Sequence, residues 1–290
     1  MVNLLLKKQM VEIFRAYFYD AKKNKMRSKG ATIGLIVLLV AFALINPNFW
    51  SPTNRTNLLR QIAPILIIGI AQSYVLITGN IDLSIGSVVG MSTMVAATLM
   101  SKGIMSPIPA LLVTLLCCLL IGVLNGLLVA KFKLPPFIAT LGTMTVARGI
   151  AQLVNGNYNT DSIMKFYPEA AQTFKNVFYY GKTLGLYNGI WIAIILWIVF
   201  NFLLSKTRTG RYIYATGSNI DAARLSGVNV VSTTVIAYVV SAFCSFVVGI
   251  ITCATVGQGT MDAGNSYEMY AVAASVIGGV STLGGQGILL

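Results

Sequence analysis

The sequence predicts an all-α integral membrane protein, a polytopic helix bundle with about eight spans. Composition is the first observation: hydrophobic residues make up 56% of the chain, charged residues 10%, and the mean hydropathy is +0.76. A soluble domain has about a quarter charged residues, because its surface must stay hydrated. The second observation is a series of apolar stretches, and the third is an uneven distribution of basic residues between them.

The apolar stretches recur at the length that a bilayer requires, roughly 20 residues for a helix. Several are short or contain glycine, so we expect some of the helices to be tilted or broken. Their ranges are 30–45, 62–78, 83–100, 108–130, 136–153, 189–204, 231–256 and 267–283. Residues 30–290 are therefore expected to form one transmembrane domain.

The basic residues predict the orientation of the spans. If the chain begins in the cytoplasm, 14 Lys and Arg residues fall in cytoplasmic segments and six in external ones. Because cytoplasmic loops are enriched in Lys and Arg, the N-terminus is predicted to be cytoplasmic. The net charge of +13 then indicates contact with anionic membrane lipid, and we expect no nucleic-acid partner.

Three segments outside the spans have distinct characters. Residues 1–29 are basic, and their apolar residues recur at helical spacing, which predicts an amphipathic helix on the cytoplasmic membrane surface. Residues 154–188, predicted to be extracytoplasmic, are rich in Tyr and Phe, which favours either an interfacial belt or a docking face for an external partner. Residues 205–230 form a predicted cytoplasmic loop.

Asp82 is a carboxylate between two apolar spans, flanked by Asn80 and Ser84. An ionisable group at membrane depth is costly and usually faces a cavity or a partner. These three residues are therefore candidates for a translocation pathway. The alternative is that Asp82 caps the third span at its N-terminus, and both roles are compatible.

Arg148 and Glu268 are further ionisable residues in or next to spans. A pair between them, or between Arg148 and Asp82, would lower the cost of burial. Neutral polar residues in the spans line a pore or bond to neighbouring helices; they are Gln72, Tyr74, Asn125 and Gln152. Asn125, Arg148 and Glu268 complete the set of pathway candidates.

The loop 205–230 contains a predicted two-turn helix from Asn219 to Gly227. The segment before it, 216–219, is predicted to be a turn whose Ser218 or Asn219 caps the helix, and Gly227 suits a left-handed stop. Asp221 lies in the first turn and Arg224 near the end, where each charge suits the helix dipole. A helix this short needs support, so we expect it to pack on the spans or on a cytoplasmic partner.

Four segments together resemble the permease subunits of ribose- and galactoside-type importers, the monosaccharide branch of binding-protein-dependent transporters driven by ATP-binding cassette subunits. They occur in the same order as in that family and cover most of the chain. They are TGNIDLSIGS at 78–87, LPPFIATLGTM at 134–144 with RG at 148–149, GRYIYATGSN at 210–219 with DAARLSGVNV at 221–230, and YE at 267–268 with AASVIGGVS at 273–281.

The resemblance implies a function and an assembly. It implies a permease that moves a small polar solute, a monosaccharide, across a bacterial inner membrane by alternating access. Its implied partners are an ATP-binding cassette subunit that holds ATP and Mg, an extracytoplasmic solute-binding protein, and a second permease copy or a sister permease. The residues that it assigns to coupling with the ATPase are Gly217, Asn219, Asp221, Ala222, Ala223, Arg224 and Gly227.

The sequence departs from the family in two places. Family members usually have ten spans, so the chain, which ends at Leu290, looks shortened by two. Met269 and Tyr270 stand where relatives tend to have Leu-Asp after the glutamate, so a role of that acidic residue does not transfer.

Other classes fit the residues less well. A membrane enzyme would need an acid–base pair, a nucleophile or a metal cluster, whereas the chain has no His and only eight acidic residues. Gly181-Lys182-Thr183 imitates the end of a phosphate loop but lacks its first glycine, so no ATPase activity and no cofactor are expected in this chain. A secondary transporter, or a permease for nucleosides or branched-chain amino acids, remains as an alternative.

Overall fold

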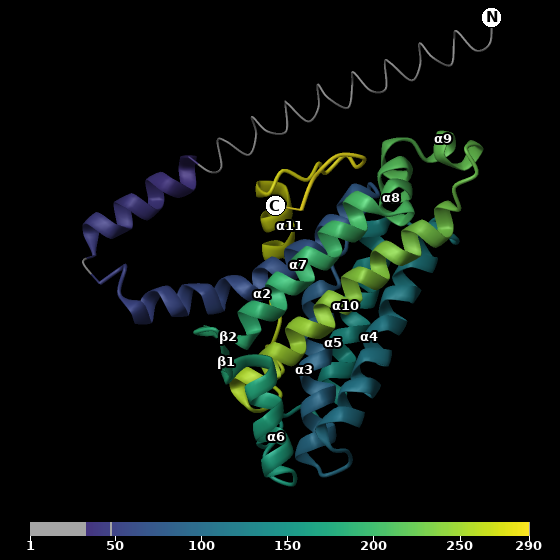
Figure 1. The fold of residues 1–290 in the computed structure, drawn as a ribbon. Helices are drawn as coiled ribbons and strands as arrows, with labels where there is room; N and C mark the ends of the chain where they lie inside the picture. The colour runs from purple at the N-terminus through teal and green to yellow at the C-terminus, as the bar shows by residue number, and fades with distance from the viewer. Residues whose placement is uncertain (1–32, 47, 290) are drawn as a thin grey trace, which may run out of the picture.

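Helices occupy most of the described residues, 33–46 and 48–289, of the computed structural model (Figure 1). The basic segment 1–29 and its predicted amphipathic helix lie outside these residues. Four described helices are long and apolar enough to cross a membrane: α2 (Pro52–Ile77), α4 (Pro107–Ala130), α7 (Asn188–Lys206) and α10 (Val230–Val256). The prediction of an all-α polytopic membrane protein is confirmed.

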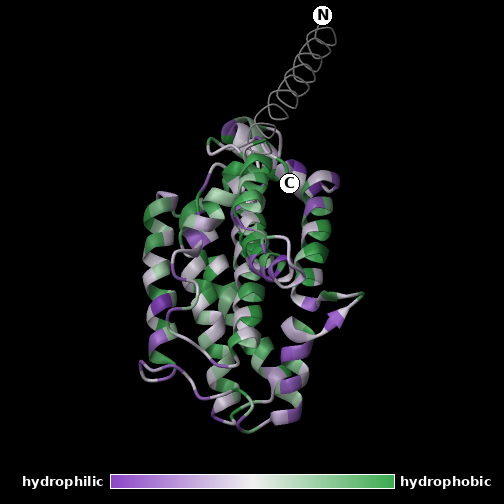
Figure 2. Cartoon of the chain, turned by 90° about the vertical axis from the view of Figure 1, so that its left-hand side faces the viewer, coloured by the Kyte–Doolittle hydropathy of each residue, from purple (hydrophilic) through white to green (hydrophobic). Residues whose placement is uncertain are grey.

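The remaining predicted spans are occupied by shorter helices. They are the helix Ile33–Ile45, α3 (Ile85–Ser101), α5 (Pro136–Leu153) and α11 (Tyr267–Ile277). Hydrophobic residues cover most of the helices, and hydrophilic residues lie mainly at their ends and in the loops (Figure 2). This distribution is the one expected of helices whose sides face lipid or one another.

Two predicted boundaries are wrong. The second span was expected to begin at residue 62, but α2 begins at Pro52, where the hydroxyl of Ser51 caps it by accepting a hydrogen bond from the Asn54 amide. The last span was expected to reach residue 283, but α11 ends at Ile277. Gly279, with φ 96°, turns the backbone out of the helix, and the following residues, 280–289, are not helical.

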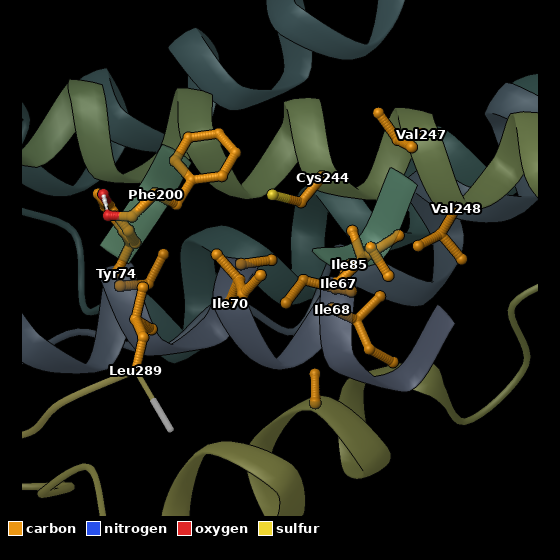
Figure 3. Packing of buried hydrophobic residues seen from close by; sticks show 14 of the residues in the cluster. Ile67, Ile68, Ile70, Tyr74, Ile85, Phe200, Cys244, Val247, Val248 and Leu289 are labelled. Carbon is orange, nitrogen blue, oxygen red and sulfur yellow. Dashed lines mark hydrogen bonds between the residues drawn. The ribbon is translucent and has the colours of Figure 1, made fainter. Parts of the chain in front are cut away.

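The bundle is organised around α10, which packs against α2, α3 and α4 (Figure 1). On its other side α2 packs against α11, where the Ser275 hydroxyl donates to the Gly69 carbonyl oxygen at 2.9 Å. Apolar side chains fill the space between these helices, and Figure 3 shows Ile67, Ile70 and Cys244 among them. Burial of these groups stabilises the bundle through close packing, which replaces the hydrophobic effect within lipid.

The two ends of the bundle carry different elements. One end carries α8 (Arg208–Ser218) and α9 (Ile220–Leu225), and we refer to it as the α9 end (Figure 1). The opposite end, the α6 end, carries α6 (Pro168–Lys175), the π-helix η1 (Asn176–Tyr180) and a hairpin, β1 (Lys182–Thr183) paired antiparallel with β2 (Leu186–Tyr187).

Side chains hold the α6 end against the long helices. The Tyr180 hydroxyl donates to the Thr255 carbonyl oxygen at 2.9 Å. The Arg60 guanidinium lies 3.4 Å from the centre of the Tyr187 ring, which joins α2 to the hairpin by a cation–π contact. Gly181-Lys182-Thr183, which imitates a phosphate loop in sequence, is part of this hairpin region.

Candidate functional site: polar groups around the start of α3

The start of α3 lies inside the bundle instead of at a surface. The chain leaves α2 at Ile77 and runs without helical structure through residues 78–84 before α3 begins. Asp82, in this segment, contacts Ser241, which lies near the midpoint of α10. Non-helical backbone at membrane depth is tolerated only where protein or water receives its polar groups. Residues 78–84 therefore depend on polar partners supplied by the surrounding helices.

Asp82 is buried, with 3% of its surface exposed, and both of its carboxylate oxygens accept hydrogen bonds. Oδ1 accepts from the Ser84 amide at 2.9 Å and from the Ser84 hydroxyl at 2.6 Å. Oδ2 accepts from the Ser241 hydroxyl at 2.7 Å. Ser84 is the N-cap residue of α3, so Asp82 binds the capping residue and does not itself occupy the cap position. These bonds offset part of the cost of burying a charge.

The hydrogen bonds continue from Ser84 into two more helices. The Asn125 amide nitrogen of α4 donates to the Ser84 hydroxyl at 2.9 Å, and the Thr143 hydroxyl of α5 donates to the Asn125 amide oxygen at 2.6 Å. All of these side chains are buried. We refer to Asp82, Ser84, Asn125, Thr143 and Ser241 as the Asp82 network. It joins the start of α3 to α4, α5 and α10.

Asn80 lies outside the Asp82 network, close to the end of α2. Its side-chain nitrogen donates to the Thr78 hydroxyl at 2.8 Å and so holds the turn that follows α2. Next to it, the Ile81 carbonyl oxygen accepts a bond of 3.1 Å from the Tyr238 hydroxyl of α10. Among the pathway candidates, Asn80 is thus a half-buried turn residue.

Arg148 binds backbone instead of a carboxylate. Its Nη1 donates to the carbonyl oxygens of Met261 at 2.8 Å and Ala263 at 3.0 Å. The ion pairs among the described residues are Lys165–Asp161 and Arg224–Asp221, so the predicted pairs of Arg148 with Glu268 or Asp82 are not formed. The physical reason is that the loop between α10 and α11 presents two carbonyl oxygens to the guanidinium.

Arg148 and Glu268 lie instead along one face of α3. An added Cβ at Gly90 would lie 2.7 Å from Arg148 Nη1, and one at Gly86 would lie 2.5 Å from Glu268 Oε2. Gly86 and Gly90 are one helical turn apart, so the two charged groups lie about 6 Å apart along the helix. We refer to Gly86, Gly90, Arg148 and Glu268 as the α3 glycine face.

The α3 glycine face differs from the Asp82 network in exposure and in bonding. Arg148 and Glu268 are half-buried, whereas every member of the Asp82 network is buried. Within the described part of the chain, the Glu268 carboxylate has no hydrogen-bond or salt-bridge partner, and Arg148 bonds only through Nη1. The face therefore offers an unpaired carboxylate acceptor and uncommitted guanidinium donors, which suits a ligand with hydroxyl groups.

The loop between α10 and α11, residues 257–266, is held between the α6 end and the α3 glycine face. The Gly259 amide donates to the Thr160 hydroxyl at 2.8 Å, and the Met261 amide donates to Asn159 Oδ1 at 2.9 Å. At its other end the Gly264 carbonyl oxygen packs against Gly86. Arg148 thus binds a loop that also contacts the segment leading to α6.

The neutral polar residues named from sequence have different environments. The Tyr74 hydroxyl donates to the Phe200 carbonyl oxygen of α7 at 2.7 Å, and Asn125 belongs to the Asp82 network, so both bond to neighbouring helices. Gln152 is exposed. Gln72 is completely buried, and its side-chain nitrogen and oxygen have no partner in the described structure.

At the α9 end, the predicted short helix is present as α9. Asn219 caps it by accepting hydrogen bonds from the amides of Asp221 and Ala222, and Gly227 has φ 82°, the predicted left-handed stop. The predicted turn at 216–218 is wrong, because these residues form the last turn of α8. Thr207 caps α8 and its register continues to Ser218, so the helix-breaking effect of Gly217 is overcome.

The surface of α9 has an attached side and a free side. Ala223 is buried in a small cluster with Val228 and Val230. Leu225 is 90% exposed and Ile220 47% exposed, and the Arg224–Asp221 pair, 3.6 Å apart, is also exposed. The expectation that α9 packs on its own chain is therefore met on one side, and the other side presents two apolar residues beside charges.

In 33–46 and 48–289, no three His, Cys, Asp or Glu side chains are placed to hold a metal ion. The four cysteines are free, and three of them are buried among apolar side chains.

Sequence reasoning missed several members of these sites. Ser241, Thr143, Gly86 and Gly90 were not singled out as partners of Asp82 or Arg148. A signal existed for the glycines, because Gly86 and Gly90 lie one turn apart in the segment that follows Asp82. For Ser241 and Thr143 the signal was weak, since small polar residues in apolar helices usually serve packing.

Comparison with known proteins gives consistent results. A family model described as "Branched-chain amino acid transport system / permease component" matches residues 54–288. The ribose import permease protein RbsC of Haemophilus influenzae is 40% identical over 88% of this chain and 77% of its own length. RbsC of Bacillus subtilis is 35% identical over 90% of this chain and 79% of its own length.

A third relative is named for a different sugar. The galactose/methyl galactoside import permease protein MglC of Escherichia coli is 32% identical over 91% of this chain and 82% of its own length. No solved structure matches the chain.

Proposed function

The chain belongs to the family of branched-chain amino acid transport system permease components, and we propose that it is the membrane-spanning subunit of an ATP-driven importer for a monosaccharide. Relatives at 31–40% identity are named as permeases for ribose, allose or galactose. The chain itself is a transport subunit and not an enzyme. ATP and Mg would be held by a partner subunit.

The observation that carries this proposal is the free side of α9. A self-contained carrier has no need of a capped two-turn helix that exposes Leu225 beside Arg224 at one end of the bundle. Exposed apolar residues next to charges are typical of a docking surface. We assign Gly217, Asn219, Asp221, Ala222, Ala223, Arg224 and Gly227 to coupling with the ATPase.

The translocation pathway is proposed to pass the α3 glycine face. Arg148 offers donors and Glu268 offers an acceptor, and each sugar hydroxyl is both a donor and an acceptor. Asp82, Ser84 and Asn125 would act indirectly, by fixing where α3 begins, and Asn80 would act by holding the turn that follows α2. In this scheme the solute meets the half-buried charges first, and the Asp82 network holds the helix that carries them.

The orientation follows from the proposed partners. The α9 end would face the cytoplasm and the ATPase, and the α6 end, with its Tyr-rich segment 154–188, would face the solute-binding protein. A second permease copy or a sister permease would complete the pathway, and anionic lipid would contact the basic segments. Closure of the ATPases on ATP would move α9 and expose the α3 glycine face alternately to the two sides.

Two other solute classes are kept as alternatives. The family description names branched-chain amino acids, and nucleosides are also small and polar. The named sugar relatives favour the monosaccharide. Measuring which solute the cognate binding protein binds, by calorimetry against pentoses, hexoses, nucleosides and leucine, separates the three.

Replacing Leu225 with Asp tests the central assignment. Leu225 is exposed, so the variant should fold and insert normally, but it should lose co-purification with the ATPase subunit and solute-stimulated ATP hydrolysis. Leu184→Asp is the matched control, because Leu184 is 87% exposed in the hairpin at the opposite end. Retention of the ATPase by Leu225→Asp, with transport intact, would remove the basis for the importer assignment and favour a secondary transporter.

A further inference from the structure

Three segments that are far apart in the sequence meet at the α9 end. They are the end of α2 with the turn after it (77–79), the last turn of α8 (216–218), and the glycine-rich turn near the end of the chain (284–287). The Gly284-Gly285-Gln286-Gly287 turn belongs neither to the Asp82 network nor to the α3 glycine face. Its contacts connect the loop that carries α9 with the segment that leads to Asp82.

The contact between α8 and α2 is made by backbone atoms. A Cβ placed on Gly217 would overlap the Ile77 carbonyl oxygen and would lie 2.7 Å from the Gly285 amide nitrogen. Any residue other than glycine at 217 would push the two helix ends apart. The close approach therefore requires glycine within a helix, where glycine is otherwise an unfavourable residue.

The glycine-rich turn closes the same contact from the other side. The Gly285 amide donates to the Ile77 carbonyl oxygen at 2.8 Å. A Cβ on Gly284 would lie 2.8 Å from the Gly79 Cα and 2.9 Å from the Gly217 carbonyl oxygen. We refer to Ile77, Gly79, Gly217, Gly284 and Gly285 as the glycine junction.

Side chains of neighbouring helices attach the turn to the bundle. The Tyr214 hydroxyl, one turn before Ser218 on α8, donates to the Gly287 carbonyl oxygen at 2.6 Å. Trp197 of α7 donates through Nε1 to the Leu289 carbonyl oxygen at 3.3 Å. Movement of α8 would therefore displace the glycine-rich turn together with the end of α2.

From the glycine junction the chain reaches the Asp82 network within three residues. Gly79 is in the junction, the Ile81 carbonyl oxygen is bonded to Tyr238 of α10, and Asp82 is bonded to Ser241 one turn further along α10. The segment 77–84 is thus packed on α8 at one end and bonded to α10 at the other. A backbone contact without flexible side chains transmits a displacement that long side chains would absorb by changing rotamer.

We propose that the glycine junction transmits movement of α8 and α9 to the start of α3, with Gly217 and Tyr214 as positioning residues of the transport cycle. This inference rests on the proposed function, since it requires an ATPase that moves α9. It goes beyond that function by identifying the route inside the chain. The route runs from Gly217 to Ile77 and Gly79, and from there to Asp82 and the α3 glycine face.

The test measures ATP hydrolysed and solute imported by the intact importer complex in proteoliposomes. Tyr214→Phe removes one hydroxyl and keeps the ring, so the complex should still assemble. The ATP consumed per solute imported should rise roughly two- to tenfold, which is the change in an equilibrium that the loss of one hydrogen bond produces. Gly217→Ala should abolish import while ATP hydrolysis continues. Import and ATP consumption at wild-type ratio in both variants would overturn the inference.

Matched controls separate transmission from general disturbance. Tyr212→Phe changes an exposed tyrosine on the same helix, and Gly149→Ala fills open space in α5, where no atom lies within 4 Å of the added Cβ. Both should behave as the wild type. If the wild-type complex neither binds an ATPase nor imports solute, the proposed function fails; if the wild type works and the junction variants match the controls, the inference alone fails.

A second measurement does not depend on import and covers the case in which Gly217→Ala fails to assemble. Hydrogen exchange of the isolated permease in detergent should show faster exchange at the Ser84 amide, which bonds to Asp82, in Tyr214→Phe than in Tyr212→Phe. Because the hydrogen bonds of Ser84 go to Asp82, Val88 and Asn125, and none goes to α8 or the glycine-rich turn, a local defect at Tyr214 would leave its exchange unchanged. Unchanged exchange at Ser84 would contradict transmission through the junction.

Discussion

The Ser241 hydroxyl of α10 donates a 2.7 Å hydrogen bond to the Asp82 carboxylate, which precedes α3 by two residues in a non-helical segment. These residues are 159 positions apart in the chain. The bond fixes the start of α3 against the middle of α10, because Asp82 also holds the Ser84 amide and hydroxyl. The position of α3 determines where Gly86 and Gly90 present their face to Arg148 and Glu268.

Ser241→Ala should lower the free energy of unfolding by about 1–3 kcal/mol, since a buried hydrogen bond to a carboxylate is lost. Ser245→Ala is the control. The Ser245 hydroxyl is equally buried but bonds only to the Ser241 carbonyl oxygen of its own helix. Thermal unfolding of the purified protein in detergent compares the two variants. An equal loss of unfolding free energy in both would mean that the bond to Asp82 stabilises the protein no more than the bond within α10 does.

Asp82→Asn should leave the protein folded but reduce solute uptake by the intact complex. Asparagine keeps the volume, an acceptor for Ser84 and a donor for Ser241, so the network can re-form without the charge. A double-mutant cycle with Ser241→Ala measures the coupling between the two positions. Wild-type uptake by the folded Asp82→Asn protein would show that the charge itself has no part in transport.

Arg148→Met should release the loop 257–266 from α5, because both bonds to the Met261 and Ala263 carbonyl oxygens are lost. We expect faster hydrogen exchange in this loop and reduced uptake. Gly149→Ala, at the next position and with open space for the added methyl group, should leave both unchanged. The assignment of Arg148 to the pathway fails if the variant takes up solute like the wild type despite a loosened loop.

A cysteine at Asn157 should react with a membrane-impermeant reagent added outside the cell, and one at Ser218 should not. Both positions are exposed, so accessibility depends on the side of the membrane. The background is low because three of the four native cysteines are buried. Labelling in the reverse pattern would invert the proposed orientation and place α9 on the side away from the ATP supply.

Arg224→Glu should fold and insert but lose ATPase co-purification or solute-stimulated ATP hydrolysis. The charge reversal near the end of α9 costs only about 0.3–1 kcal/mol through the helix dipole, too little to unfold the bundle. Lys165→Glu is a matched reversal of an exposed basic residue at the α6 end. Equal ATPase binding and equal hydrolysis in the two variants would assign α9 a purely structural role.

Much of the fold could be predicted because its signals are local. Apolar length placed helices at the predicted spans, and Asn219 and Gly227 marked the ends of α9 through capping and a left-handed turn. Asp82 was expected to face a cavity or a partner, since an ionisable group at membrane depth is costly. Each of these inferences depends on a few neighbouring residues and on the thickness of a bilayer.

The tertiary structure decided which distant groups meet. Ser241 and Thr143 are ordinary small polar residues in apolar helices, and only helix packing brings them to Asp82 and Asn125. Arg148 was expected to pair with a carboxylate, but it donates instead to two backbone carbonyl oxygens of the loop 257–266. From the sequence, Gly217 was expected to lie in a turn. In the fold it is part of α8, and its backbone packs directly against the Ile77 carbonyl oxygen. Sequence specifies what each residue can bond, whereas the packing of whole helices, a sum over many weak contacts, decides which partner lies within reach.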